Sequence, residues 1–410
     1  MRWWRRAVAP VKGRDMLHLL PRTMAGFMAR LTLSLAAVLS LGCAHAPAPV
    51  VPEQLLSDAL FEPPSLAPDP DQVFRMSPAM RDYAQSELAV LATRGDPRRA
   101  LIAALYEKQQ LRLDYDSTRT RDAAQAFAAR AGNCLSLVIM TAVFAQHLGL
   151  QVSYQAVQTE DFYSRSGGLY LASKHVNLVL GPRPSRSSLD RGDGESLTVD
   201  FLPPSELRGQ RSMPLESHTI VAMFFNNRAA ELLAANRVAE AYWYARAALI
   251  QDPRFFSSAN TLGVIYSRAG HRALAESAFR RVLLAEPEQV SALSNLVQLL
   301  QAQGRQDEAA PLALQLAQLQ PEAPFHQFNL GRTAMAEGRF DDARKLFLRE
   351  LRLQPYQDEV HFWAARAFWQ LGQPQQAARH MRQAVEYSVN RDAHDRYAAK
   401  LSHLRQGQFE

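Results

Sequence analysis

The sequence predicts an α+β protein in which a mixed domain of helices and a small antiparallel sheet is followed by an all-α solenoid. The second half of the chain repeats every 34 residues with the marks of paired helices. The part before it combines helical periodicity with two short segments of alternating apolar and polar residues. With 410 residues, of which 47% are hydrophobic and 21% charged, the chain is globular in composition and long enough for two or three domains.

The charge of the chain lies in one place. The 46 Lys and Arg residues exceed the 40 Asp and Glu residues by six. Residues 1–42 hold seven of the basic residues and one acidic residue, so they carry the whole excess. Elsewhere arginines are scattered among carboxylates, without the basic stripe that a phosphate backbone requires. We therefore expect no nucleic-acid partner.

Residues 1–42 are predicted to be an export signal. The eleven apolar or small residues Leu31–Leu41 suit a signal peptide and make up about half of a bilayer-spanning helix. They lead into SLGC, which resembles the lipobox of bacterial lipoproteins, with Ser40 where leucine is usual. The resemblance implies lipidation of Cys43, and Ala44 after it implies an anchor in the outer membrane, facing the periplasm. A secretory signal with an incidental cysteine is the alternative.

Residues 43–75 are predicted to be a proline-rich tether. Seven prolines lie between positions 47 and 70. Because a polyproline-type chain rises about 3.1 Å per residue, residues 43–70 can span at most about 90 Å.

The domain at 76–216 begins with helices. Helical periodicity covers residues 80–93, 97–108 and 121–130, and an apolar run follows from Leu135 to Leu148. Asn133 before this run is a good N-cap, and Gly149 after it is a good stop. Cys134 then lies in the first turn of a buried helix, where the helix dipole favours a thiolate. The alternative is that Cys134 is a small buried apolar residue.

Two short strands follow this helix. KHVNLVL (174–180) and SLTVDF (196–201) both alternate, and pairing Val176 with Val199 makes His175 and Asp200 direct cross-strand neighbours. A carboxylate there can orient the imidazole while the other ring nitrogen serves a thiol. The segment Asp161–Ser173 before them is predicted to be an ordinary connection or a flexible loop beside the site.

AGNCLSLVIMTAVFAQHLGLQVSYQAV (131–157), with RTRDAAQAFAAR before it and KHVNLVL and VDFLPP after it, resembles the bacterial transglutaminase-like superfamily. The resemblance covers about residues 76–210 and implies a papain-like fold. It implies Cys134 as nucleophile, His175 as general base and acid, and Asp200 as the residue that orients His175. The superfamily includes transglutaminases, cysteine peptidases, amidases and inactive members. We expect no cofactor, and the three residues lack the spacing of a metal site.

Residues 217–391 are predicted to form five helix pairs. Each unit has a residue suited to the left-handed turn after its first helix, a small residue in its second helix and, except in the last, a proline at its end. These marks are Asn236, Gly270, Gly304, Gly338 and Gly372; Ala241, Ala275, Ala309, Ala343 and Ala377; and Pro253, Pro287, Pro321 and Pro355. The units run over 222–255, 256–289, 290–323, 324–357 and 358–391, followed by a capping helix and tail at 392–410. The pattern resembles tetratricopeptide repeats.

This second resemblance implies that a protein or peptide partner binds the concave face formed by the first helices. The positions that face inward in the family are Asn260, Gln298, Phe328, Arg332, Phe362, Arg366 and Trp369. Alternatively, these aromatic side chains pack between repeats and the arginines are solvated.

Two functions follow. One is a membrane-anchored cysteine acyl-transfer enzyme of peptidase, amidase or transglutaminase type, which acts on a protein or peptide amide while the repeats recruit the partner. The other is a non-catalytic lipoprotein adaptor with an inactive transglutaminase-like domain.

Overall fold

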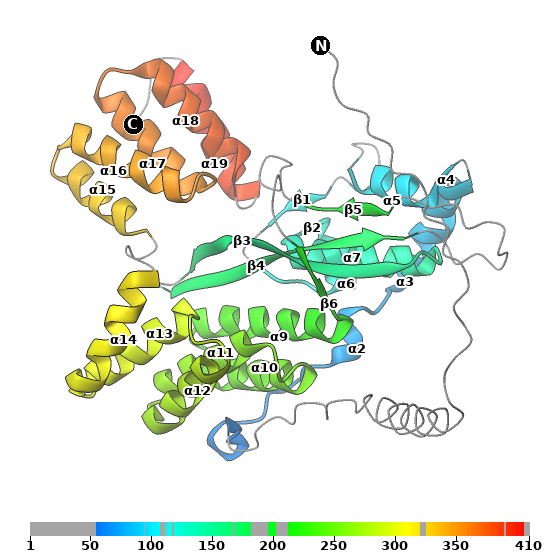
Figure 1. The fold of residues 1–410 in the computed structure, drawn as a ribbon. Coiled ribbons are helices and arrows are strands. Elements are labelled where there is room, and N and C mark those ends of the chain that lie inside the picture. Colours follow the sequence, from blue (N-terminus) through cyan, green and yellow to red (C-terminus); the bar gives the residue numbers. More distant parts are fainter. Residues whose placement is uncertain are drawn as a thin grey trace, which may run out of the picture. The chain divides into compact units, whose positions relative to one another are not determined.

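In a computed structural model, the described part of the protein is mostly helical, with a four-stranded sheet and a separate pair of short strands (Figure 1). The structure describes residues 55–93, 95–106, 111, 113–116, 119–166, 169–181, 196–201, 212–319, 325–388 and 391–405. The chain divides into residues 1–50 and 51–410. The predicted export signal, Cys43 and the start of the tether lie outside the described residues. None of the described helices has the length and apolar character needed to cross a membrane.

The described part of the predicted tether is folded against the repeats, so the prediction of a free tether to residue 75 is wrong. Leu55 and Phe61 are buried in the hydrophobic core of the first repeats, and the Phe61 ring stacks on Tyr242 with centroids 4.2 Å apart. The Tyr242 hydroxyl donates to Asp58 Oδ1 at 2.6 Å. The prolines of this segment suggested an extended chain, but Leu55 and Phe61, which lie between them, are buried in the core of the first repeats.

The first helices agree with the periodicity. They are α2 (Pro70–Val73), α3 (Pro78–Tyr83), the π-helical segment η3 (Ala84–Leu88), α4 (Ala89–Thr93), α5 (Pro97–Tyr106) and α6 (Ala123–Ala129). The Ser77 side chain accepts from the Met80 amide at the start of α3, where Pro78 occupies the first position.

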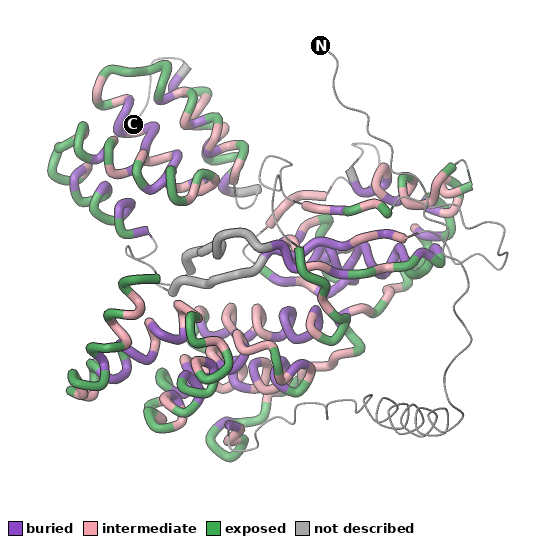
Figure 2. Tube along the Cα trace, viewed as in Figure 1, coloured by how far each residue is buried: buried purple, intermediate pink, exposed green. Residues whose placement is uncertain are grey.

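The central helix α7 (Cys134–His147) is buried nearly all round, as the apolar run predicted. Asn133 caps it by accepting from the Ser136 amide at 2.9 Å, and Gly149 ends it with a φ of +72°. Figure 1 shows α7 alongside β4, and Figure 2 shows it mostly buried. The helix therefore holds Cys134 at the edge of a rigid core.

The sheet has the strand order β5-β4-β3-β6, with all neighbours antiparallel. The strands are β3 (Val152–Ser166), β4 (Leu169–Leu180), β5 (Leu197–Val199) and β6 (Ser212–Leu215); β1 (Asp114–Tyr115) pairs separately with β2 (Ala131–Gly132). The described residues of Asp161–Ser173 are strand, so the prediction of a connection or loop was wrong, although Gly167 and Gly168 lie outside the described residues. The Phe and Tyr residues on both sides of that glycine pair favour strand.

The register of β4 and β5 differs from the predicted one by two residues. Leu178 pairs with Val199, and Leu180 pairs with Leu197. Because side chains alternate with a period of two, a shift of two residues leaves every side chain on its predicted face. His175 and Asp200 therefore stay on the same face but are diagonal, and continuing the register places Asn177 opposite Asp200.

Helix pairs follow from residue 217 onward. They are α9 (Ser217–Ala234) with α10 (Val238–Gln251), α11 (Phe256–Arg268) with α12 (Arg272–Ala285), α13 (Val290–Ala302) with α14 (Gln306–Leu319), α15 (His326–Ala336) with α16 (Phe340–Leu353) and α17 (Asp358–Gln370) with α18 (Pro374–Glu386). Helix α19 (Arg391–Arg405) comes last. All five residues predicted for the left-handed turns have a positive φ, from +60° at Asn236 to +85° at Gly270. The predicted alternation of helix and turn is confirmed.

Glycine in the first helix of two pairs makes room for an aromatic ring. A β-carbon at Gly263 would lie 2.5 Å from the Phe279 ring, and one at Gly331 would lie 2.5 Å from the Phe347 ring. In these two helix pairs, the glycine of the repeat motif is therefore required by the packing of the phenylalanine ring against it.

Helix α9 belongs to two hydrophobic cores. Its residues Ile220–Phe225 pack in the core that contains α7 and the sheet, whereas Leu232 and Leu233 pack in the core of the first repeats. The predicted boundary between residues 216 and 217 therefore does not separate the hydrophobic cores.

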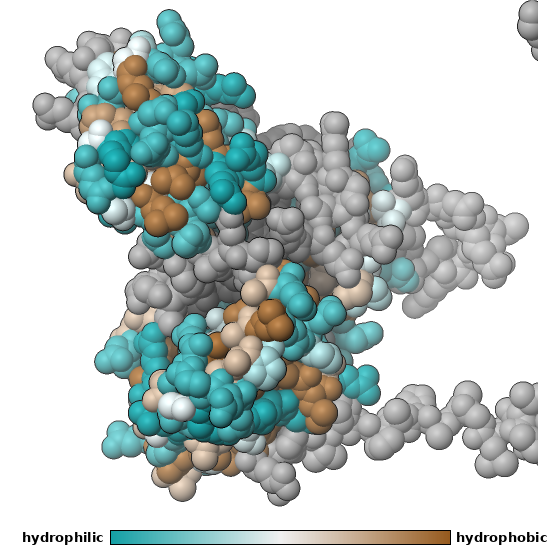
Figure 3. Space-filling model, turned by 60° about the vertical axis from the view of Figure 1, so that its left-hand side comes forward, coloured by the Kyte–Doolittle hydropathy of each residue, from teal (hydrophilic) through white to brown (hydrophobic). Residues whose placement is uncertain are grey.

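The visible face in Figure 3 is mostly hydrophilic over the described helices, with hydrophobic side chains in small separate groups. The helix pairs include exposed large apolar side chains, the most exposed being Leu284 and Leu314.

Candidate functional site

Cys134, His175 and Asp200 come together at the N-terminal end of α7. Cys134 is the first residue of that helix, His175 lies on β4, and Asp200 directly follows β5. His175 Nε2 donates to Asp200 Oδ1 at 2.7 Å, and these two side chains are only 2% and 7% exposed. His175 and Asp200 lie on the same face of the sheet, as the alternation in the sequence predicted, and this is sufficient for their contact although the register differs by two residues.

The His175 imidazole is held in its charged form. Burial by itself lowers its pKa, but the hydrogen bonds with Asp200 and Cys134, together with the charges of both, outweigh this and raise the pKa to about 10. Because Nε2 faces Asp200, Nδ1 is the ring nitrogen left for the Cys134 thiol. The site thus brings together a cysteine sulfur, an imidazole and a carboxylate in the order required for proton transfer between sulfur and imidazole.

Asn177 holds the other oxygen of Asp200. Its Nδ2 donates to Asp200 Oδ2 at 3.0 Å, from the position opposite Asp200 on the neighbouring strand. The carboxylate therefore accepts from two side chains of β4 and has a fixed orientation. Asn177 was not among the predicted site residues, although the alternation in KHVNLVL already placed it on the same face as His175.

A polar network fixes the backbone around Cys134. The Asn133 side chain accepts from the Ser136 amide and donates to Thr120 Oγ1 at 2.9 Å. The Arg121 amide donates to Ser136 Oγ at 2.8 Å. A β-carbon at Gly132 would lie 2.7 Å from that of Ser136, so this approach requires glycine. These contacts join the residues before α6 to the first turn of α7.

The same network reaches the first repeat. Glu231 on α9 accepts from the Thr120 amide at 2.6 Å and also pairs with Arg228. Thr120 thus links Glu231 to Asn133, the neighbour of Cys134. Glu231 lies 97 positions beyond Cys134 in the sequence, and no local pattern indicated this contact.

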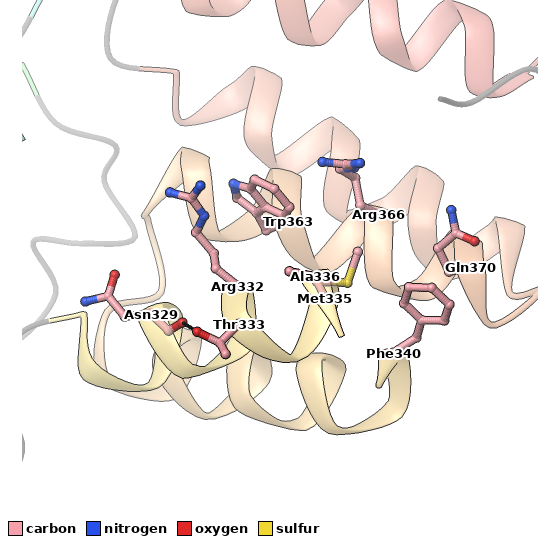
Figure 4. A pocket seen from close by; sticks show the side chains of 9 residues that line it. All are labelled: Asn329, Arg332, Thr333, Met335, Ala336, Phe340, Trp363, Arg366 and Gln370. Carbon is pink, nitrogen blue, oxygen red and sulfur yellow. Dashed lines mark hydrogen bonds between the residues drawn. The ribbon is translucent and has the colours of Figure 1, made fainter. Parts of the chain in front are cut away.

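A second candidate site is a pocket of about 590 Å³ between α15 and α17. Figure 4 shows the Trp363 ring between the guanidinium groups of Arg332 and Arg366. The remaining lining residues are Asn329, Thr333, Met335, Ala336, Phe340 and Gln370.

The seven predicted partner-binding residues lie in different surroundings. Arg332 and Arg366 line the pocket, whereas Phe328 is fully buried beside Phe347. Phe362 stacks on Tyr397, and Trp369 is partly buried against the last core. Phe328 is therefore not available to a partner.

The other two residues lie in earlier repeats. The Asn260 side-chain oxygen accepts from Asn295 at 3.0 Å, and Gln298 is exposed and donates to Ser294. The sequence reasoning missed Trp363, which lies one position after Phe362 and three before Arg366, so a shift of one residue on the same helix would have found it.

The comparisons with known proteins bear on the repeats. The family model for the tetratricopeptide repeat matches residues 260–325 and 328–395. The chain thus contains tetratricopeptide repeats, as the 34-residue period predicted, and such repeats indicate a role in protein–protein interaction. No match is found among the curated proteins.

Similar solved structures include MamA AMB-1, with 25% identity, coverage of 41% of this chain and 91% of that chain, and a TM-score of 0.23. YrrB, described as a TPR protein with an unusual peptide-binding site, has 18% identity, coverage of 45% and 98%, and a TM-score of 0.24. PilF of Pseudomonas aeruginosa has 21% identity, coverage of 47% and 96%, and a TM-score of 0.26.

Proposed function

We propose that the protein is a cysteine acyl-transfer enzyme that acts on an amide of a protein or peptide, which the repeats recruit. The observation that carries this proposal is the buried contact between His175 Nε2 and Asp200 Oδ1, with Cys134 hydrogen-bonded to the same ring. Burying a charged pair is costly unless the pair is well hydrogen-bonded, and here it sits beside the one described cysteine. A charged imidazole beside a thiol is the arrangement that activates sulfur as a nucleophile.

The chemistry follows from these contacts. The Cys134 thiol proton resides on His175, so that the Cys134 thiolate attacks the amide carbonyl carbon and the electron pair of the carbonyl bond moves to the oxygen. His175 then gives its Nδ1 proton to the departing amine, which leaves a thioester on Cys134. Water or a second amine attacks the thioester while His175 accepts its proton, so the starting enzyme is restored. Asp200 keeps the ring oriented throughout.

The start of α7 supplies a donor for the charge that develops on oxygen. The first amides of a helix have no partner within the helix, and the Cys134 amide is one of them. The Ser136 amide is already occupied by the Asn133 cap. The Cys134 amide is thus a backbone donor for an oxyanion on the carbonyl under attack.

Thiol alkylation tests the proposed site. In a Cys43→Ala background, iodoacetamide should label Cys134 in the folded protein near pH 6, and Cys134→Ser should remove the label. His175→Ala should slow labelling by about tenfold or more at that pH, because the charged ring no longer stabilises the thiolate. Labelling that requires unfolding, or that is equally fast in His175→Ala, would show that the site is not activated. That result would favour the adaptor, in which the repeats act without catalysis.

We extend this proposal to the location of the protein. The lipobox-like segment supports a lipid on Cys43 that holds the protein in the outer membrane on the periplasmic side. Metabolic labelling with a clickable fatty acid in a bacterial host should mark the full chain but not Cys43→Ala. Equal labelling of both would rule out this anchor.

A further inference from the structure

The pocket between α15 and α17 contains two positive charges, those of Arg332 and Arg366. Within the described part of the chain, Arg332 and Arg366 have no carboxylate partner within salt-bridge distance. Ion pairs are seen for other arginines of the helix pairs, none of which lines this pocket: Arg228, Arg237, Arg246, Arg280, Arg305, Arg339 and Arg344. The two pocket arginines are thus charged groups whose counter-charge is still to be supplied.

Trp363 holds these two groups in place. The guanidinium carbon of Arg332 lies 4.9 Å from the centre of the Trp363 ring, and that of Arg366 lies 4.6 Å from it. Stacking on an aromatic ring restricts long side chains that otherwise move freely. The two guanidinium carbons cannot be more than about 9.5 Å apart, because both distances end at one ring centre. Two like charges at this separation repel each other, and anionic groups bound to them relieve the repulsion.

The rest of the lining suits a peptide rather than a small anion. It contains no carboxylate. Asn329, Thr333 and Gln370 offer polar groups to a peptide backbone, whereas Met335 and Phe340 offer apolar surface to a side chain (Figure 4). A pocket of about 590 Å³ is large for one small anion and adequate for several peptide residues.

The pair of arginines is confined to the last two repeats. Arg332 and Arg366 are 34 positions apart, so they occupy the same position in consecutive units. That position holds Ala230, Val264 and Gln298 in the first three units. The binding groups thus arise locally and are not a general property of the array.

We propose that this pocket binds an acidic segment of a partner protein through two carboxylates that are two residues apart in an extended peptide. Residues i and i+2 of an extended chain point to one side and are about 6.6 Å apart, which is within the upper limit of about 9.5 Å on the separation of the two guanidinium carbons. Each guanidinium can hold one carboxylate with two parallel hydrogen bonds. The inference rests on the proposed recruitment of a peptide by the repeats, and it adds the chemical class of that peptide.

The test measures binding of a defined probe to the full chain carrying Cys134→Ala, so that no turnover occurs. The probe is a fluorescein-labelled, amidated peptide, Gly-Ser-Gly-Glu-Ala-Glu-Leu-Gly-Ser-Gly, and its partner contains glutamine at both glutamate positions. Fluorescence anisotropy should show that the acidic probe binds and that its affinity falls as salt is added. The affinity of the glutamine probe should be lower by about tenfold or more.

Variants locate the binding. Arg332→Ala and Arg366→Ala should each weaken binding by about tenfold or more, whereas Arg339→Ala, which removes the same charge outside the pocket, should change it less than about twofold. If an alanine variant does not fold, Arg366→Lys keeps the charge but not the paired hydrogen bonds, and should still weaken binding. Equal loss in Arg339→Ala would overturn the proposal.

Two further outcomes would also overturn it. One is displacement of the probe by millimolar inorganic phosphate, which would indicate a general anion site. The other is binding of heparin as tight as that of the probe, which would indicate a polyanion partner. Cys134 alkylation is measured separately, so failure of probe binding would leave the proposed chemistry standing, and failure of alkylation would leave the pocket standing.

Discussion

His175 illustrates how one residue can depend on its surroundings for its charge. Desolvation opposes the imidazolium, and only the contacts with Asp200 and Cys134 keep it. Asn177 supports the pair by holding the second carboxylate oxygen. His175, Asp200 and Asn177 are thus joined by hydrogen bonds through the Asp200 carboxylate, and loss of that carboxylate would remove a contact that keeps His175 charged.

The raised pKa of His175 predicts how stability varies with pH. In the unfolded chain a histidine has a pKa of about 6.5, and in the folded protein that of His175 rises to about 10. Its contribution to the free energy of unfolding is therefore complete below about pH 6.5 and is lost as the pH rises through about 10. Urea unfolding at several pH values should show the difference between wild type and His175→Ala shrinking over this range. A difference that grows with pH would contradict the charged state.

At this scale the sequence predicted residue types and faces better than partners. Alternation put His175 and Asp200 on one face, and the cap and stop of α7 placed Cys134. Trp363 was not predicted because the family resemblance indicated its neighbour Phe362. Adjacent residues on a helix point in directions that differ by about 100°, so an error of one position selects a side chain on another face. The role of Glu231 was not predicted because its contact with Thr120 joins parts of the chain that are distant in the sequence.

At the scale of elements, the repeats were predictable because their signals are local. A left-handed residue ends each first helix, and the glycines at 263 and 331 receive a phenylalanine from the second helix of the same pair. The pairing of β4 with β5 was harder, since the sequence between them does not fix the register and two alignments keep the same faces inside. Strand was not predicted over Asp161–Ser173 because the sequence there contains Gly167 and Gly168, and adjacent glycines are typical of loops.

The close contact at Gly331 predicts a size-dependent defect. Gly331→Ala should lower the free energy of unfolding by about 1–3 kcal/mol, because the new methyl group overlaps the Phe347 ring. The double variant Gly331→Ala, Phe347→Leu should recover part of this loss relative to the sum of the two single variants. Thermal and urea unfolding provide the measurement. Simple additivity of the two changes would mean that the pair does not clash.

At the scale of the whole molecule, helix α9 joins the repeats to the candidate active site. Its first half lies in the core with α7, its second half lies in the repeat core, and Glu231 bonds to the Thr120 amide. A boundary drawn from repeat signals cannot detect this sharing, because α9 satisfies both the repeat pattern and the burial that the sheet domain requires.

Substitution of Glu231 should therefore change the reactivity of Cys134. Glu231→Ala leaves the Thr120 amide without its partner, which should cost about 1–3 kcal/mol of the free energy of unfolding. It should also slow Cys134 alkylation in the folded protein, whereas Glu231→Gln, which keeps an acceptor oxygen, should restore most of the rate. Arg237→Ala, which breaks an exposed ion pair in the same repeat, is the matched control. Equal alkylation in Glu231→Ala and wild type would show that the network does not position Cys134.

The docked segment around Leu55 and Phe61 determines how much space an anchored molecule can explore. With a lipid on Cys43, twelve residue steps separate the anchor from Leu55, and a chain of that length spans at most about 40 Å, compared with about 90 Å for residues 43–70. The volume within reach of the anchor falls to about a tenth, since volume varies with the cube of the radius. The effective concentration of the repeats toward a partner at the same membrane rises by about the same factor.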